Sequence, residues 1–180
     1  MTRTRFDALT RSLHWLIALL VLAAYAIALG REALPKGDFR TALLGLHMSL
    51  GLSILLLMAV RLAWRIAAPQ VEPIPMTPTM QLASRLAHIG LYVLLVAVPL
   101  VGMAATWMKG RTVGFFGYPL GSPFTANPTT GKLFAEAHEL VGNSLMALAG
   151  LHAVAGLAHH YILKDDTLRR MMPQFGNGRA

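Results

Sequence analysis

Cysteine is absent from the 180 residues of this chain, and its absence excludes several kinds of site. Without thiols the chain has no disulfides, no thiolate zinc site, no cysteine-ligated iron–sulfur cluster and no C-x-x-C-H motif for covalent haem attachment. Charged residues are also scarce, at 13% of the chain, whereas 55% of it is hydrophobic. Soluble domains carry about 25% charged residues, so this composition indicates a protein that resides in a lipid bilayer. Any iron in it would have to be held by histidine.

The net charge of +8 does not indicate a nucleic-acid-binding protein. Lys and Arg flank hydrophobic stretches and form no groove-reading motif. Membrane topology and anionic lipid explain them more simply. We therefore expect membrane lipid, and no nucleic acid, among the partners, and the sequence predicts no obligatory protein partner.

Four stretches contain no charged residue and are long enough to cross a bilayer. They cover residues 13–30, 41–60, 86–108 and 140–163. Crossing the hydrocarbon core takes about 20 apolar residues, and a helix satisfies its own backbone hydrogen bonds there. The sequence therefore predicts one all-α domain over residues 1–180, an integral membrane four-helix bundle. The first stretch also resembles a signal peptide, but it is longer than the usual h-region of about 7 to 15 residues.

Basic residues are distributed unequally between the two ends of this bundle. Four spans put both termini on one side, which carries 10 Lys and Arg residues against 6 on the other. Because cytoplasmic loops are enriched in Lys and Arg, we predict that both termini are cytoplasmic. The connector 67–80 contains four prolines, so we expect an extended chain there and no fifth helix. The outer loop, 109–132, is long enough to cap the bundle.

Histidines stand out within the hydrophobic stretches, because an ionisable side chain is costly in a membrane and indicates function. His138 and His152 are 14 residues apart, on the order of 21 Å along a helix, and share one face. One helix could thus bear ligands for two stacked haems b. At the outer level only His47 is available as the partner of His138.

At the inner level the sequence leaves the pairing open. By depth alone, His14 could pair with His152, His88, His159 or His160. Two neutral imidazoles leave haem iron no open coordination position, which suits electron transfer. Glycines and alanines near the histidines would let a flat macrocycle approach the backbone, although small residues also serve helix packing in membranes.

Motifs along the whole chain carry a family resemblance. They are Ser12-Leu13-His14-Trp15, His47-Met48-Ser49-Leu50-Gly51, Leu56 with Met58, Val60 and Arg61, Leu151-His152-Ala153, His159-His160-Tyr161, and the most specific one, the block 164–173. With these motifs the chain resembles the bacterial cytochrome b561 family, also described as superoxide oxidase or superoxide:ubiquinone oxidoreductase.

The resemblance implies two b haems with bis-histidine ligation, one by His14 with His152 and one by His47 with His138. It also implies electron transfer from a donor at the periplasmic face to ubiquinone in the bacterial inner (cytoplasmic) membrane, with superoxide as one donor. The expected reaction is one-electron oxidation of superoxide near the outer haem and reduction of ubiquinone at the inner one. The role of His88 stays open.

Basic and titratable residues at the two ends would assist this reaction. A basic outer surface would attract the superoxide anion; its residues are Arg31, Lys36, Arg40, Lys109, Arg111 and Lys132. On the quinone side, His159 or His160 could supply protons. The residues available for haem propionates or quinone carbonyls are Arg11, Arg61, Arg85 and Lys164, although snorkelling to lipid phosphate also explains each of them.

Two other functions fit the sequence less well. A cytochrome b subunit of a hydrogenase or formate dehydrogenase has a similar helix plan, but it needs a large docked partner and the loops here are short. A histidine-lined metal or proton transporter is the other alternative. The lack of Asp and Glu within the uncharged stretches opposes it, because such relays usually mix carboxylates with histidine.

Overall fold

The computed structural model describes residues 4–69 and 71–172. Within these residues there are four long helices: α1 (Ala8–Glu32), α2 (Asp38–Ala67), α3 (Pro78–Met108) and α4 (Pro128–Tyr161). Each has a segment long and apolar enough to cross a membrane. Many of their large hydrophobic side chains are exposed, as expected for a bundle whose outer surface meets lipid. The chain is therefore a four-helix transmembrane bundle, as predicted.

Three of the four described helices begin at a residue that caps them. The side chains of Asp7, Thr77 and Asn127 each accept a hydrogen bond from a backbone N–H in the first turn, which satisfies a donor that the helix leaves free. Proline follows the cap in α3 and in α4, where its missing N–H costs nothing. The proline-rich connector between α2 and α3 contains no helix among its described residues, as predicted.

The helices extend beyond the uncharged stretches. The largest difference is in α4, which begins at Pro128 instead of residue 140 and ends at Tyr161 instead of residue 163. Its first turns contain Lys132, Glu136 and Glu139, which are acceptable helix formers but lie outside the hydrocarbon core. An uncharged stretch indicates the part of a helix that lies in the hydrocarbon core, and the helix itself can continue beyond it. Because α4 begins earlier than expected, the outer loop is shorter than expected.

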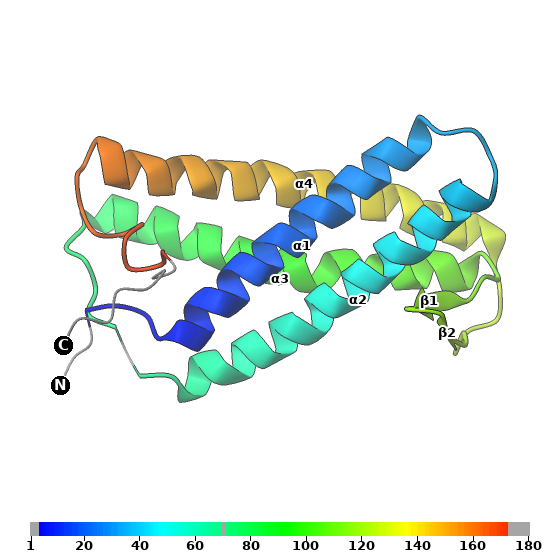
Figure 1. The fold of residues 1–180 in the computed structure, drawn as a ribbon, viewed down its shortest axis with the longest axis horizontal. Helices are drawn as coiled ribbons and strands as arrows, with labels where there is room; N and C mark the ends of the chain where they lie inside the picture. The colour runs from blue at the N-terminus through cyan, green and yellow to red at the C-terminus, as the bar shows by residue number, and fades with distance from the viewer. Residues whose placement is uncertain (1–3, 70, 173–180) are drawn as a thin grey trace.

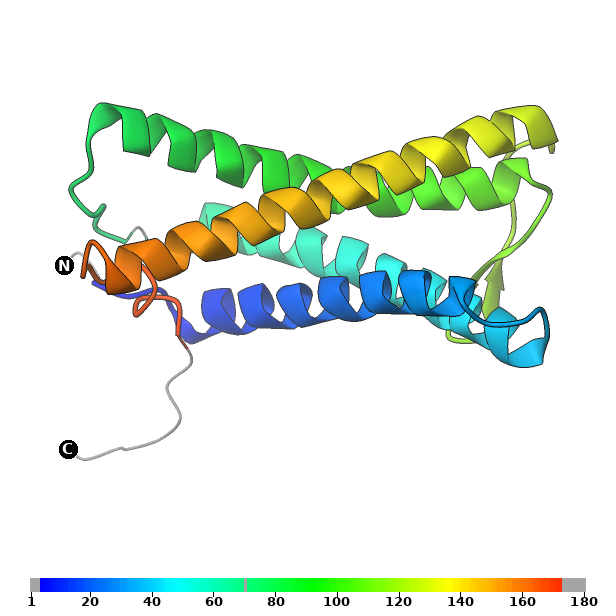
Figure 2. The ribbon, with the colours of Figure 1, turned by 90° about the horizontal axis from the view of Figure 1, so that it is seen from above.

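The four helices form two antiparallel hairpins, α1 with α2 and α3 with α4 (Figures 1 and 2). The hairpins join where α2 packs on α3, whereas α1 and α4 do not pack closely together. A core cluster of buried side chains, formed by Ile17, Ala24, Ile54 and Met58, lies between α1 and α2. Helix α1 begins and α4 ends at the same end of the bundle (Figure 1), which we call the inner end. The opposite end is the outer end.

The outer loop forms a small hairpin that is seated on α2. Strands β1 (Val113–Phe115) and β2 (Tyr118–Leu120) pair antiparallel, and the turn residues Phe116 and Gly117 both have positive φ, as tight hairpins require. The Ser49 hydroxyl accepts a hydrogen bond of 2.9 Å from the Phe116 N–H. A groove of about 520 Å³ runs between α2 and the hairpin, on a different face of α2 from His47.

Candidate functional site

The outer level of the bundle brings together His47 of α2 and His138 of α4. Their ring centroids are 6.0 Å apart, with the planes at 87°. The Nδ1 of His47 lies 2.9 Å from the carbonyl oxygen of Ala24, and the Nδ1 of His138 lies 2.9 Å from that of Val98. A carbonyl only accepts, so each Nδ1 carries the proton and donates. Each Nε2 is then an unprotonated nitrogen that is available as a metal ligand.

The inner level brings together three imidazoles. His14 of α1 and His152 of α4 have ring centroids 6.2 Å apart. His88 of α3 also approaches this pair, with its centroid 5.3 Å from that of His152. Its Nδ1 is 3.4 Å from the Ser84 hydroxyl, a long and weak contact.

The ring separations distinguish between these partners. Two imidazoles that bind one metal ion from opposite sides have centroids about 6 Å apart, because the metal–nitrogen bond is about 2.0 Å and the ring centre lies about 1.1 Å behind the nitrogen. His47 with His138, and His14 with His152, are at this separation. His88 is too close to His152 for an ion between them.

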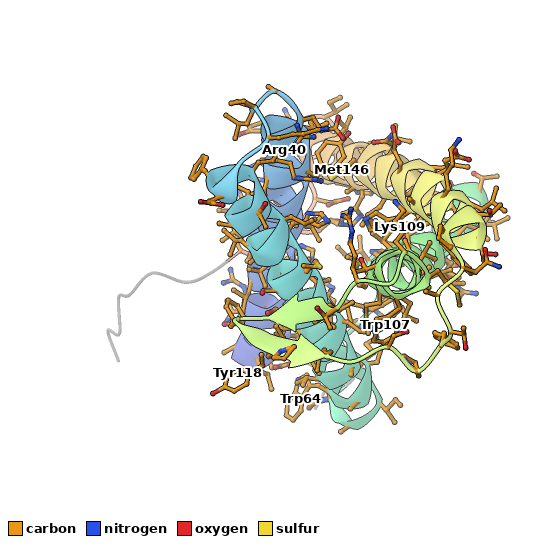
Figure 3. All side chains as sticks on the ribbon, turned by 90° about the vertical axis from the view of Figure 1, so that its right-hand side faces the viewer. Arg40, Trp64, Trp107, Lys109, Tyr118 and Met146 are labelled. Carbon is orange, nitrogen blue, oxygen red and sulfur yellow. The ribbon has the colours of Figure 1, made fainter. Side chains whose placement is uncertain are left out.

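The face of α4 that bears these histidines carries small residues and one buried leucine. At intervals of three and four, it presents His138, Gly142, Leu145, Ala149, His152 and Gly156. Gly142 and Gly156 each follow a histidine by one turn and are half-buried, yet a Cβ added at either would meet nothing within 4 Å. The end-on view places α1 and α2 on one side and α3 and α4 on the other (Figure 3). The donors and the open backbone fit a flat macrocycle ligated at both axial positions.

Helix α3 holds His138 in place by a close backbone approach. A Cβ added at Gly102 would lie only 2.8 Å from His138 Cε1 and 3.0 Å from its Nδ1. Gly102 is one turn after Val98, whose carbonyl accepts from the same ring. The role of Gly102 cannot be recognised from the sequence, because glycine is common in membrane helices and nothing in the chain indicates which helix this one faces.

The basic residues of the outer end do not form one cluster. Arg40 donates to the Leu34 carbonyl at 2.9 Å, and Arg31 is half-buried at the end of α1. Lys132 faces Glu136 at 3.7 Å in an exposed pair. The remaining three are exposed: Lys36, Lys109 and Arg111. Arg40 lies near α2 and Lys109 near the end of α3 (Figure 3).

Carboxylates reduce the positive charge at the outer end. Four acidic residues accompany its six basic ones, so the formal sum there is +2. They are Glu32, Asp38, Glu136 and Glu139. The inner end keeps the larger excess, +6. The difference between the two ends therefore stays at four charges, with or without the carboxylates.

At the inner end, the two histidines expected on the quinone side differ in their surroundings. His159 Nδ1 lies 2.6 Å from the Asp165 carboxylate, and both side chains are largely shielded from solvent. Burial acts to raise the pKa of Asp165, but hydrogen bonds from Thr167 and His159 outweigh it, so this pKa lies below its usual value. The ring of His160 instead packs edge-on against Tyr161.

The segment that follows α4 folds back against the start of α1. Trp15 Nε1 donates to the carbonyl of Met171 at 2.8 Å, and Arg11 donates to that of Met172 at 3.0 Å. The block 164–173, the most specific motif of the sequence, thus lies next to the helix that bears His14, except for residue 173, which is outside the described residues.

Four membrane-spanning helices with paired interior histidines define a membrane cytochrome of the b type. A family model described as prokaryotic cytochrome b561 matches residues 5–174. The chain belongs to this family, as its motifs predicted, and is a membrane electron-transfer protein. Haem b is the cofactor expected for the family.

Relatives match over nearly their full length. The chain is 34% identical over 173 residues to the "Probable superoxide oxidase CybB" of Yersinia pestis, covering 94% of this chain and 97% of that protein. It is 36% identical to cytochrome b561 homolog 1 of Escherichia coli K12, covering 94% and 98%. It is 34% identical to the cytochrome b562 of Cereibacter sphaeroides, covering 93% and 94%.

Proposed function

We propose that this chain binds two haems b, the outer one through His47 and His138 and the inner one through His14 and His152. The observation that carries this proposal is the presence of two imidazole pairs at a ring separation of about 6 Å on two levels of α4. Support also comes from the open backbone at Gly142 and Gly156. When bound, each haem accepts and releases one electron at its iron.

The protein's own groups prepare the ligands for this role. The carbonyls of Ala24 and Val98 hold the outer rings in one tautomer and orientation, and a hydrogen bond to Nδ1 makes the opposite nitrogen a stronger ligand. The two histidines of each pair would hold the iron and would leave no position on it for oxygen. Ligation of this kind suits the passage of single electrons between the two levels.

We propose superoxide as the electron donor and ubiquinone as the acceptor. Two superoxide anions each lose one electron and become oxygen, and one ubiquinone takes up two electrons and two protons to become ubiquinol. The name of the Yersinia relative supports the donor. Arg40 and Lys109 lie at the outer end, where their positive charge would attract an anion. In this proposal the outer end faces the periplasm, and the inner end, with both termini, faces the cytoplasm.

Reduction of a quinone also requires a group that can pass protons at the inner end. His159 is the better candidate of the two histidines, because the Asp165 carboxylate accepts a hydrogen bond from its Nδ1 at 2.6 Å and orients its ring. It follows His152 by seven residues, two helical turns on the same face. His160 packs on an aromatic ring and has the weaker case.

The experiment that tests this function uses the full chain purified in detergent. A pyridine haemochrome assay should return close to two haems b per chain, and acid acetone should extract both. The reduced protein should then pass electrons from a superoxide source to a short-chain ubiquinone, and superoxide dismutase should abolish that reduction. A preparation without haem would refute the proposal. Two haems without quinone reduction would favour the partner-docked cytochrome b subunit.

A further inference from the structure

Arg61 is a cationic side chain on the interior face of α2. It follows Ile54 and Met58 at helical spacing, and both of those side chains are buried. The Cζ of its guanidinium lies 5.8 Å from the ring centroid of Tyr92 on α3. Tyr92 itself packs against the bundle core. Arg61 is therefore turned into the bundle, toward α3, and not along α2 toward the inner surface.

Arg61 lies at the level of the inner histidines. The Tyr92 ring beneath it follows His88 by one turn of α3, and the His88 ring centroid lies 5.3 Å from that of His152. The ion pairs among the described residues involve Lys132, His159 and Arg169, and none includes Arg61. A cation among apolar side chains at membrane depth without a counter-ion is costly. The position thus requires an anion that the described part of the chain does not supply.

We propose that Arg61 binds a propionate carboxylate of the inner haem, with the ring of Tyr92 positioning the guanidinium. This inference rests on the proposed function, because a haem between His14 and His152 supplies the carboxylate. Arginine presents a planar fork of donors that matches a carboxylate, and an aromatic face stabilises a cation that lies over it.

A lipid phosphate is the competing source of negative charge, since long basic side chains reach the interface from helix ends. The structure offers other arginines for that role. Arg65, one turn nearer the end of α2, and Arg85, in the second turn of α3, are both exposed. Arg61 is only partly exposed and lies over Tyr92 instead.

The pairing has a consequence for the redox equilibrium. A positive charge near the iron favours the reduced state, which carries one more electron, and a neutralised propionate opposes reduction less. Arg61 therefore raises the midpoint potential of the inner haem and makes it a better acceptor for electrons from the outer one.

Redox titration of the purified, two-haem protein tests this inference. Arg61→Gln should shift the reduction equilibrium of one haem about tenfold toward the oxidised form, which is about 59 mV for a one-electron couple, and leave the other haem unchanged. The affected component should be the one that is missing in His152→Ala. Arg61→Lys keeps the charge but loses the fork, so its shift should be smaller but measurable. Arg169→Gln, at an exposed arginine of the same end that pairs with Asp166, is the matched control and should leave both midpoints in place.

The outcomes separate this inference from the function on which it rests. Wild-type protein without haem would refute the proposed function. Two haems whose midpoints are unchanged in both Arg61 variants would refute the role of Arg61 alone and favour pairing with lipid. Loss of only the inner haem in Arg61→Gln would support the role, provided that Arg61→Lys retains both haems with a lowered inner midpoint. If Arg61→Gln loses both haems, the test is the midpoint of the inner haem in Arg61→Lys. An inner-haem midpoint equal to that of the wild-type protein would overturn the inference.

Discussion

Replacing Gly102 by alanine should selectively weaken the outer haem site. The added Cβ would lie 2.8 Å from His138 Cε1, so the ring must move by about 0.6 Å to reach an ordinary contact of about 3.4 Å. The ring is held against the same helix by its 2.9 Å hydrogen bond to the Val98 carbonyl, one turn before Gly102. Such a displacement stretches that bond beyond normal hydrogen-bond geometry.

The expected size follows from what a lost hydrogen bond to a ligand histidine costs. Changes to such bonds typically reduce metal affinity about 10- to 100-fold, or about 1.4 to 2.7 kcal/mol. We therefore expect Gly102→Ala to lose much of the outer haem during purification and to keep the inner haem. The haem content per chain, combined with low-temperature absorption spectra, measures the loss of each component.

Gly30→Ala is the matched control, because a Cβ at this exposed position of α1 meets nothing within 4 Å. It should retain both haems, and alanine should stabilise the helix slightly. If Gly102→Ala retains both haems with unchanged spectra, the reasoning about the seat of His138 is wrong. Loss of both haems together would indicate that α3 and α4 have separated, which a lower thermal unfolding temperature would reveal.

Three further predictions concern the ligands and the donor. His47→Ala and His138→Ala should each remove the same haem, so their difference spectra should match; spectra that report different haems would contradict the outer pair. His152→Ala should lose the inner haem, whereas His88→Ala should keep both, and the reverse result would overturn the inner pair. The rate of superoxide oxidation should fall as ionic strength rises, because salt screens the attraction of an anion to basic residues. With a formal sum of only +2 at the outer end the slope should be shallow, and a rate independent of salt would refute steering.

The sequence predicted the four membrane-spanning helices and that α1 begins at the end of the bundle where α4 ends. These features follow from the uncharged stretches, because a polar backbone in lipid leaves a helix as the only economical structure. It did not predict the helix ends. Helix α4 extends 12 residues before the expected start, since its polar first turns are helical without being apolar. The sequence also did not predict that the outer hairpin packs on Ser49, because that hydrogen bond joins residues 67 positions apart in the chain.

The histidines illustrate what periodicity can and cannot determine. The 14-residue spacing put His138 and His152 on one face of one helix, because fourteen residues make close to four whole turns. At the inner level, depth alone left four partners open for His14. In the structure the ring of His152 lies 6.2 Å from that of His14, and the ring of His88 lies 5.3 Å from that of His152. The ligand assignments themselves stay predictions.

By itself, the sequence determined that this protein is a four-span membrane protein whose only strong metal ligands are histidines, and its motifs identified the family. Those properties are local, since they depend on composition and on the order of residues along each helix. Only the tertiary structure decided that Ala24 and Val98 hold the outer rings, that Gly102 lies under His138, and that Arg61 turns toward Tyr92. Each of these contacts joins two helices, and it depends on how the helices rotate and tilt against one another, which small differences in side-chain packing decide.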